Sequence, residues 1–123
     1  MAGTTPKSTG DQAEALALEH LLRHGLTLLC RNYRVARGPR ARGGEIDLIV
    51  RERDGTIVFV EVRSRATVAF GGALASVTAR KRQRIVLAAR HYLAGLAHTP
   101  PCRFDVVAIE GAQVQWLRAA FDA

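Results

Sequence analysis

The chain has 123 residues, 48% of them apolar and 24% charged, which suits one domain with a single core and excludes a chain disordered throughout. Its 18 Lys and Arg residues outnumber its 11 Asp and Glu residues, and the resulting net charge of +7 favours nucleic acid as a partner. A basic composition without such a partner is the alternative. No apolar run approaches the length of a membrane span, so no membrane partner is expected.

The N-terminal segment is small and polar and lacks the apolar core of a signal peptide. We therefore expect a disordered tail over residues 1–9 and a single domain over 10–123. The two cysteines, Cys30 and Cys102, lie far apart, each in an apolar stretch, which favours buried thiols in a reducing compartment over a disulfide. Together these features predict a cytoplasmic protein.

Hydrophobic periodicity and turn residues divide the chain into alternating helical and extended segments. In chain order, the sequence predicts a helix over 11–24, a strand over 26–35, a basic loop over 37–44, strands over 46–51 and 56–65, a loop over 67–75, a helix from Ser76 or Thr78 to about Leu96, and strands over 103–110 and 113–118. Gly25 is expected to end the first helix, and Gly111 to lie in the last turn.

The two central strands have apolar residues at alternate positions, which fixes how they must pair. A one-residue slip would turn every side chain of one strand to the other face, so the apolar faces must coincide. This requirement predicts an odd-numbered loop or a bulge around residues 53–55, and Gly55 suits the left-handed position of a three-residue loop. The predicted shared faces are Ile46, Leu48 and Val50 with Val58, Val60 and Val62, and the predicted opposed pairs are Leu48 and Val60, Ile46 and Val62, Asp47 and Glu61, and Glu45 and Arg63.

Two carboxylates directly opposite each other on a sheet repel, and apolar neighbours would raise one pKa sharply. A divalent cation such as Mg²⁺ removes the conflict between Asp47 and Glu61, and can polarise a phosphate and activate a water. The alternative is a solvated acid pair on an open face, with Arg63 and Arg65 as salt partners.

Glu14 lies four residues before Leu18 and seven before Leu21, which places it on the predicted buried stripe of the first helix. An acid in that position calls for a partner or a cation. The alternative is an N-terminal charge that only favours the helix dipole, a contribution of about 0.3–1 kcal/mol.

These residues resemble the YraN-like family of small bacterial proteins over about 10–109. The matching residues are Gly10, Glu14, Ala15, Gly25, Arg31 to Arg34, Gly44 to Ile49, Val58 to Arg65, Phe70, Gly71, Lys81 and Arg103 to Val107. The resemblance implies an α/β restriction-endonuclease-like fold, with a mixed central sheet flanked by two helices, of the kind compared with archaeal Holliday-junction resolvases.

That fold's active-site pattern is an Asp followed by Glu-x-Lys on the next strand. By this resemblance Asp47 and Glu61 are metal ligands, the backbone carbonyl of Val62 is a third, and Glu14 is an accessory acid. Arg63 occupies the Lys position, and a guanidinium cannot serve as a general base, although it can position a phosphate. Lys81, at the start of the second predicted helix, is a candidate for the missing ammonium.

Arginines on both sides of these motifs are candidates to follow a nucleic-acid backbone. They are Arg31, Arg34, Arg37, Arg40, Arg42, Arg80, Arg82 and Arg84. A solvated loop and a solvated helix face are the alternatives for the last six.

Three hypotheses follow for the function. The first is a Mg²⁺- or Mn²⁺-dependent, structure-selective phosphodiesterase in which Asp47, Glu61 and Glu14 hold the metal and Arg63 or Lys81 contacts the phosphate. The second is a nucleic-acid-binding module of the same fold that cuts poorly or not at all. The third is an assembly protein that uses the sheet edge near Trp116. DNA is favoured over RNA as the substrate. The sequence does not decide whether the protein forms a homodimer.

Overall fold

The computed structural model of the chain describes residues 9–36, 43–64 and 76–123. In chain order its elements are α1 (Thr9–Arg23), β1 (Thr27–Val35), β2 (Gly44–Arg51), β3 (Ile57–Ser64), α3 (Ala79–Ala94), β4 (Cys102–Glu110) and β5 (Gln113–Phe121). This order of a helix, three strands, a helix and two strands confirms the order predicted from the sequence. The predicted tail, apart from Thr9, and most of the predicted loops over 37–44 and 67–75 lie outside the described residues.

Local signals set the ends of the two helices. Gly25 follows α1 with a left-handed φ of +89°, a conformation that costs glycine little. Thr78 is the N-cap of α3, and its hydroxyl accepts a hydrogen bond from the Lys81 backbone N–H. Of the two predicted caps, Thr78 and not Ser76 therefore begins the helix, and Lys81 lies in its first turn.

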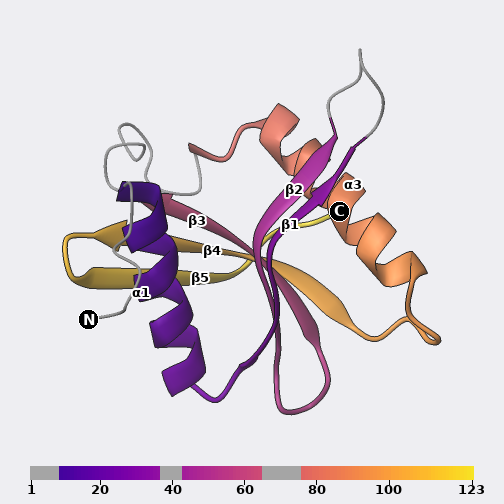
Figure 1. Cartoon of the computed structure of the whole chain (residues 1–123), viewed down its shortest axis with the longest axis horizontal. Helices are drawn as coiled ribbons and strands as arrows, with labels where there is room; N and C mark the ends of the chain where they lie inside the picture. The colour runs from indigo at the N-terminus through magenta and orange to yellow at the C-terminus, as the bar shows by residue number, and fades with distance from the viewer. Residues whose placement is uncertain (1–8, 37–42, 65–75) are drawn as a thin grey trace, which may run out of the picture.

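The five strands form one sheet in the order β1-β2-β3-β4-β5. β3 and β4 are parallel, with α3 in the crossover between them, and all other neighbours are antiparallel. Figure 1 shows the twist of the sheet: β1 and β2 rise steeply, whereas β4 and β5 run across the view. The mixed sheet with two helices confirms the predicted α/β class.

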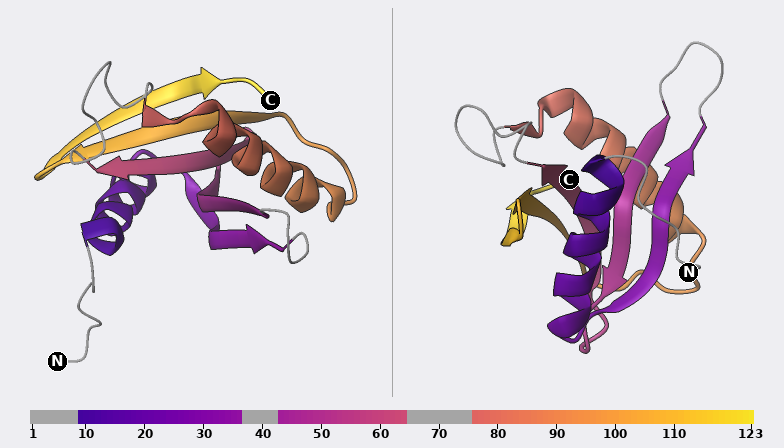
Figure 2. Two further views of the ribbon diagram at one scale, coloured as in Figure 1. Left: turned by 90° about the horizontal axis from the view of Figure 1, so that it is seen from above. Right: turned by 60° about the vertical axis from the view of Figure 1, so that its left-hand side comes forward.

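Alternate residues of the central strands face two separate cores. On β3, Val58 and Val60 pack in the core under α1, whereas Ile57 and Phe59 pack in the core under α3. The two helices therefore cover opposite faces of the sheet, an arrangement that Figure 2 shows from two sides. Among the described residues, no helix is long and apolar enough to cross a lipid bilayer.

The hairpin of β2 and β3 has the predicted register close to its turn. Leu48 pairs with Val60 as expected. A three-residue loop over 53–55 joins the strands, and Gly55 has a φ of +96°. The ladder ends at the Leu48–Val60 pair, so the predicted pairs farther along, including Ile46 with Val62, are not part of it.

The predicted shared face of Ile46 with Leu48 and Val50 is wrong. Ile46 belongs to the core under α3, whereas Leu48 and Val50 belong to the core under α1. The pleat is interrupted between them. On β2 the ladder to β3 ends at Leu48, and on β1 the facing residue, Asn32, has a left-handed φ of +52°. Both neighbouring strands thus let β2 rotate at Asp47.

The buried stripe of α1 also differs from the prediction. Ala13, Ala17 and Leu21 are the fully buried residues, whereas Glu14 and Leu18 are half-buried at the side of the helix. The small side chains of the two alanines let α1 lie close to the sheet, so the buried stripe falls one residue away from Glu14.

The prediction of two buried thiols is likewise wrong. Cys30 and Cys102 are both free, as expected, but Cys30 is half-buried and Cys102 is exposed. Cys30 packs against the core under α3 from the edge strand β1, and an edge strand buries less of its surface than a central one. Cys102 is the first residue of β4, directly after the Pro100-Pro101 segment, where the strand has only begun to enter the sheet.

Candidate metal centre

Asp47 of β2 and Glu61 of β3 come together at the point where their strands separate. The ladder between the strands ends at the Leu48–Val60 pair, and each acid is the next residue along its strand away from the turn. Beyond that point the Asp47 side chain continues the connection, because its Oδ2 accepts a hydrogen bond of 2.8 Å from the Val62 backbone N–H. This bond brings the Asp47 carboxyl group within hydrogen-bonding reach of the Glu61 carboxyl group.

The surroundings of the two acids disfavour their charged forms. The Glu61 side chain is only 2% exposed, and burial, followed by the charge of Asp47, raises the pKa of Glu61 to about 8. Burial also raises the pKa of Asp47, and the hydrogen bond from the Val62 N–H opposes that shift. Two carboxyl groups within hydrogen-bonding reach of each other ionise together at low cost only when a cation lies between them. Without a cation they share a proton.

The two oxygens of Glu61 have different surroundings. Oε2 accepts a hydrogen bond of 3.1 Å from Arg63 Nη1 and lies 3.6 Å from Lys81 Nζ. Oε1 is buried and has no hydrogen-bond donor among the residues that the structure describes. A buried oxygen without a donor is costly. A proton shared with Asp47, or a cation between the acids, would satisfy it.

Asp105 of β4, the other buried acid in the described part of the chain, has hydrogen-bond donors at both of its carboxylate oxygens. Its carboxylate accepts hydrogen bonds from Arg103 Nε, from Trp116 Nε1 at 2.8 Å and from the Ala119 backbone N–H at 2.9 Å. These bonds fasten β5 to β4, so Asp105 has a structural role. Both oxygens of Asp105 therefore have donors within the protein, whereas Glu61 Oε1 has none among the described residues.

Arg63 lies next to Glu61 and connects it to the segment before α3. Its guanidinium donates from Nη1 to Glu61 Oε2, from Nε to Ser76 Oγ at 3.1 Å and from Nη2 to the Ser76 carbonyl oxygen at 3.3 Å. The predicted position of Glu45 opposite Arg63 is not part of the β2–β3 ladder. Glu45 instead pairs with cations of α3.

Lys81 reaches the acids from the first turn of α3. Its Nζ lies 3.2 Å from Glu45 Oε1 and 3.6 Å from Glu61 Oε2, so the ammonium lies between two carboxylates. Burial by itself would raise the pKa of Glu45, but the hydrogen bond and charge of Lys81, with the charge of Arg84, outweigh burial and lower it. The two carboxylates also offset the unfavourable effect of the helix dipole on a cation in the first turn.

The short distance between α3 and β2 depends on Gly44. A Cβ atom at this position would lie 2.5 Å from the Arg84 carbonyl oxygen and 2.7 Å from the Ala88 backbone nitrogen. Only glycine therefore lets the helix lie this close to the strand. The sequence offers one weak signal for this, the Gly43-Gly44 pair directly before the Asp47 motif, which by itself is typical of a flexible loop.

Glu14 of α1 lies close to the acid pair without joining it. Burial and the charge of Asp47 raise the pKa of Glu14, while Arg31 and a hydrogen bond with Asn32 oppose the shift. Within residues 9–36, 43–64 and 76–123, no three His, Cys, Asp or Glu side chains gather closely enough to form a metal site. The centre therefore consists of two adjacent carboxylates, with Glu14 nearby.

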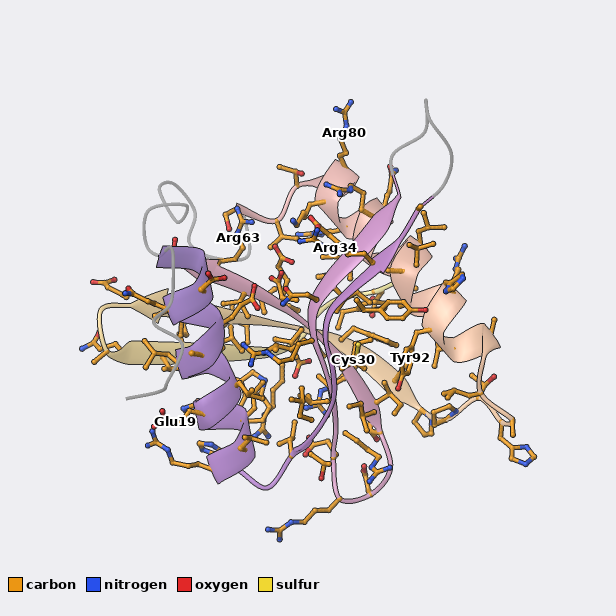
Figure 3. All side chains as sticks on the ribbon, in the orientation of Figure 1. Glu19, Cys30, Arg34, Arg63, Arg80 and Tyr92 are labelled. Atoms are coloured by element: carbon orange, nitrogen blue, oxygen red, sulfur yellow. The ribbon has the colours of Figure 1, made fainter. Side chains whose placement is uncertain are left out.

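Some of the predicted phosphate-binding arginines are exposed to solvent. Arg31 and Arg34 of β1 and Arg80 of α3 are exposed. Figure 3 shows Arg34, Arg63 and Arg80 in the upper part of the view, whereas Glu19 lies at the lower end of α1. The predicted arginines of the basic loop over 37–44 lie outside the described residues; they are Arg37, Arg40 and Arg42.

Arg82 and Arg84 are half-buried and make contacts within the protein. Arg82 Nε donates to the Val77 carbonyl oxygen at 3.0 Å, and its guanidinium lies 5.3 Å from the centre of the Phe121 ring. Arg84 Nε donates to the Gly43 carbonyl oxygen at 3.2 Å, and its Nη2 lies 3.5 Å from Glu45 Oε1. These contacts hold α3 in place against the sheet.

The fold and the site define an α/β protein with a mixed five-stranded sheet and a buried acid pair where two of its strands separate. The family described as "Uncharacterised protein family UPF0102" matches residues 13–109, and the chain belongs to this family. The YraN-like resemblance drawn from the motifs is thereby confirmed.

Relatives in this family match nearly the whole chain. A UPF0102 protein of Methylibium petroleiphilum is 67% identical, over 97% of this chain and 98% of the relative. Another from Paracidovorax citrulli is 62% identical, over 98% of this chain and 87% of the relative. A third, from Cupriavidus taiwanensis, is 58% identical, over 95% of this chain and 85% of the relative.

Proposed function

We propose that the protein is a Mg²⁺-dependent nuclease of the restriction-endonuclease-like fold, which hydrolyses phosphodiester bonds in structured nucleic acid, DNA rather than RNA. The observation that carries the proposal is the Asp47–Glu61 pair, in which a buried Glu61 oxygen has no donor among the described residues. The acids lie on the second and third strands after the first helix, in the order that the resemblance implies. A cytoplasmic location is proposed with this substrate.

The residues at the centre fit a small divalent cation. Carboxylate oxygens are the ligands that Mg²⁺ prefers, and it commonly keeps several waters beside one or two carboxylates, so Asp47 and Glu61 suffice. Mn²⁺ accepts the same oxygens. The Val62 carbonyl and Glu14 stay the proposed additional ligands. When bound, the cation would polarise a phosphate and lower the pKa of a water.

The protein's own side chains divide the remaining tasks. The Val62 N–H orients Asp47, and Arg63 orients Glu61 through Oε2. A cation beside the acid pair, from Arg63 or Lys81, stabilises the charge that develops on the phosphate. The exposed Arg34 and Arg80 would attract the nucleic-acid backbone through their charge.

Metal titration and cleavage assays with acid variants test the proposal. We expect Asp47→Ala and Glu61→Ala to lose Mg²⁺ binding in calorimetry and Mg²⁺-dependent cleavage of branched, flapped and single-stranded substrates. Binding of nucleic acid should persist or improve, because removing a carboxylate removes a charge that repels phosphate. Glu19→Gln, at an exposed position on α1, is the matched control and should behave as the unaltered protein.

A nucleic-acid-binding module without appreciable cleavage is the second candidate. The observation that favours it is Arg63 at the position where the resemblance implies lysine, combined with a cluster of only two carboxylates in the described residues. In that case the unaltered protein would bind nucleic acid but cut no substrate with Mg²⁺ or Mn²⁺, and Asp47→Ala would alter only thermal stability.

A further inference from the structure

Arg63 has the wrong surroundings for a residue that must contact a phosphate. Its three donor nitrogens bond Glu61 Oε2, Ser76 Oγ and the Ser76 carbonyl oxygen, at 3.1–3.3 Å. A guanidinium fork that turned toward a phosphate would give up the connection between β3 and the segment before α3. The geometry of Arg63 is therefore that of a link between two parts of the protein.

Lys81 makes fewer hydrogen bonds within the protein than Arg63 does. Its ammonium carries three donor hydrogens, yet among the described residues it makes one hydrogen bond, to Glu45 Oε1 at 3.2 Å. Glu61 Oε2 lies 3.6 Å away and attracts the ammonium through charge. The lysine stem is flexible and its ammonium has one hydrogen bond to release, so the ammonium can move toward a phosphate beside the acid pair while α3 stays in place.

We propose that Lys81 is the residue that contacts the phosphate at the acid pair, and that Arg63 is a positioning residue that holds Glu61 and the start of α3. The inference rests on the proposed function and identifies the source of its cation. Glu45 holds the ammonium while no phosphate is present, and a bound phosphate takes its place. The ammonium thus comes from α3, because β3 carries arginine where the resemblance implies lysine.

Amine acetylation tests the contact without relying on cleavage. Lys7 and Lys81 are the only lysines of the sequence, so Lys7 serves as a reference within the same molecule. The protein is acetylated with and without a branched DNA, with Ca²⁺ in place of Mg²⁺, and the modified peptides are measured by mass spectrometry. We expect DNA to lower acetylation of Lys81 several-fold and to change Lys7 little. Equal acetylation of Lys81 in both conditions would overturn the inference.

Substitutions separate contact from positioning. Lys81→Met should lower the cleavage rate by about 10²–10³-fold, as for loss of one stabilising donor, while the protein still folds and still binds Mg²⁺. Arg63→Ala should lower Mg²⁺ affinity and melting temperature, and Arg63→Lys, which can still reach Glu61, should recover part of the Mg²⁺ affinity. In Arg63→Ala, DNA should still protect Lys81 from acetylation.

The opposite pattern would assign the contact to Arg63: normal cleavage by Lys81→Met, and loss of cleavage by Arg63→Ala at unchanged Mg²⁺ affinity. Protection of Lys81 in a protein that cuts nothing would support the phosphate contact while the nuclease proposal fails. Cleavage by a protein whose Lys81 is not protected would refute the contact alone. A protein that binds no nucleic acid would refute both.

Discussion

Glu61 is the residue at which the stability of the fold and the proposed function conflict. Its carboxyl group is buried beside Asp47, and ionisation leaves Oε1 with no donor from the described residues. A charge in such a place is costly unless a partner compensates it. A position that served stability alone would be better filled by an uncharged side chain, so this acid is expected to gain from a ligand.

This conflict predicts how stability depends on pH. The pKa of Glu61 is raised from 4.5 to about 8, so the folded protein binds more protons than the unfolded chain between these values. The contribution of Glu61 to the free energy of unfolding should therefore be highest below about pH 4.5 and should fall as pH rises toward 8. Denaturant titrations at several pH values, without divalent cations, measure this slope.

Glu61→Gln removes the titrating group and should flatten the decline, whereas Glu19→Gln should leave it unchanged. Mg²⁺ should raise stability more at pH 8 than at pH 6, because the fraction of Glu61 that is ionised and can bind it increases as pH approaches the pKa of about 8. A decline of equal slope in Glu61→Gln would show that Glu61 is not the group responsible.

The strands at the two edges of the sheet are irregular. On β1 the register shifts between Leu28 and Cys30, and Asn32 has a φ of +52°. On β5 Ala119 has a φ of +49°, and its N–H bonds the Asp105 side chain inside the same sheet. Such bulges discourage a further strand from pairing. The bulge in β5 makes pairing of another strand at the edge near Trp116 less favourable.

The close packing of α3 on β2 makes Gly44 a test of the relation between helix position and site. Gly44→Ala would place a Cβ against helix backbone, which cannot move aside by a side-chain rotation. We expect a loss of about 1–3 kcal/mol in the free energy of unfolding, as for an overpacked core, and reduced cleavage because Lys81 moves with the helix.

Gly95→Ala is the matched control, because Gly95 lies at the other end of α3 with a φ of −83° and its nearest neighbour would be 3.6 Å from a Cβ. Gly95→Ala should change stability and cleavage little. If Gly44→Ala lowered stability but left cleavage intact, the position of α3 would not matter for the reaction.

At the scale of the whole molecule, the net charge of +7 predicts that binding to nucleic acid is electrostatic. The logarithm of affinity should fall linearly with the logarithm of salt concentration. Arg34→Gln and Arg80→Gln should each lower the magnitude of this slope by about 1, if each side chain neutralises one phosphate. Arg40 and Arg42 lie outside the described residues. We expect Arg40→Glu and Arg42→Glu to weaken binding to all nucleic-acid sequences alike.

Arg90→Gln is the control for these variants. Arg90 is exposed on α3, ten residues and roughly 15 Å along the helix from Arg80. Fluorescence anisotropy at several salt concentrations measures the slopes. Affinity that does not change with salt would argue against the arginine surface as the binding face.

The sequence by itself determined the order of the elements, the Gly55 turn, the Leu48–Val60 register and the proximity of Asp47 to Glu61. These features depend on alternation, turn residues and neighbours along the chain, all of which can be read locally. Only the tertiary structure decided that Ile46 turns to the other core, that Glu45 pairs with Lys81 and that Arg63 binds Ser76. Those contacts join separate elements, and their geometry depends on how closely α3 approaches β2, a distance that the packing at Gly44 sets and no local pattern encodes.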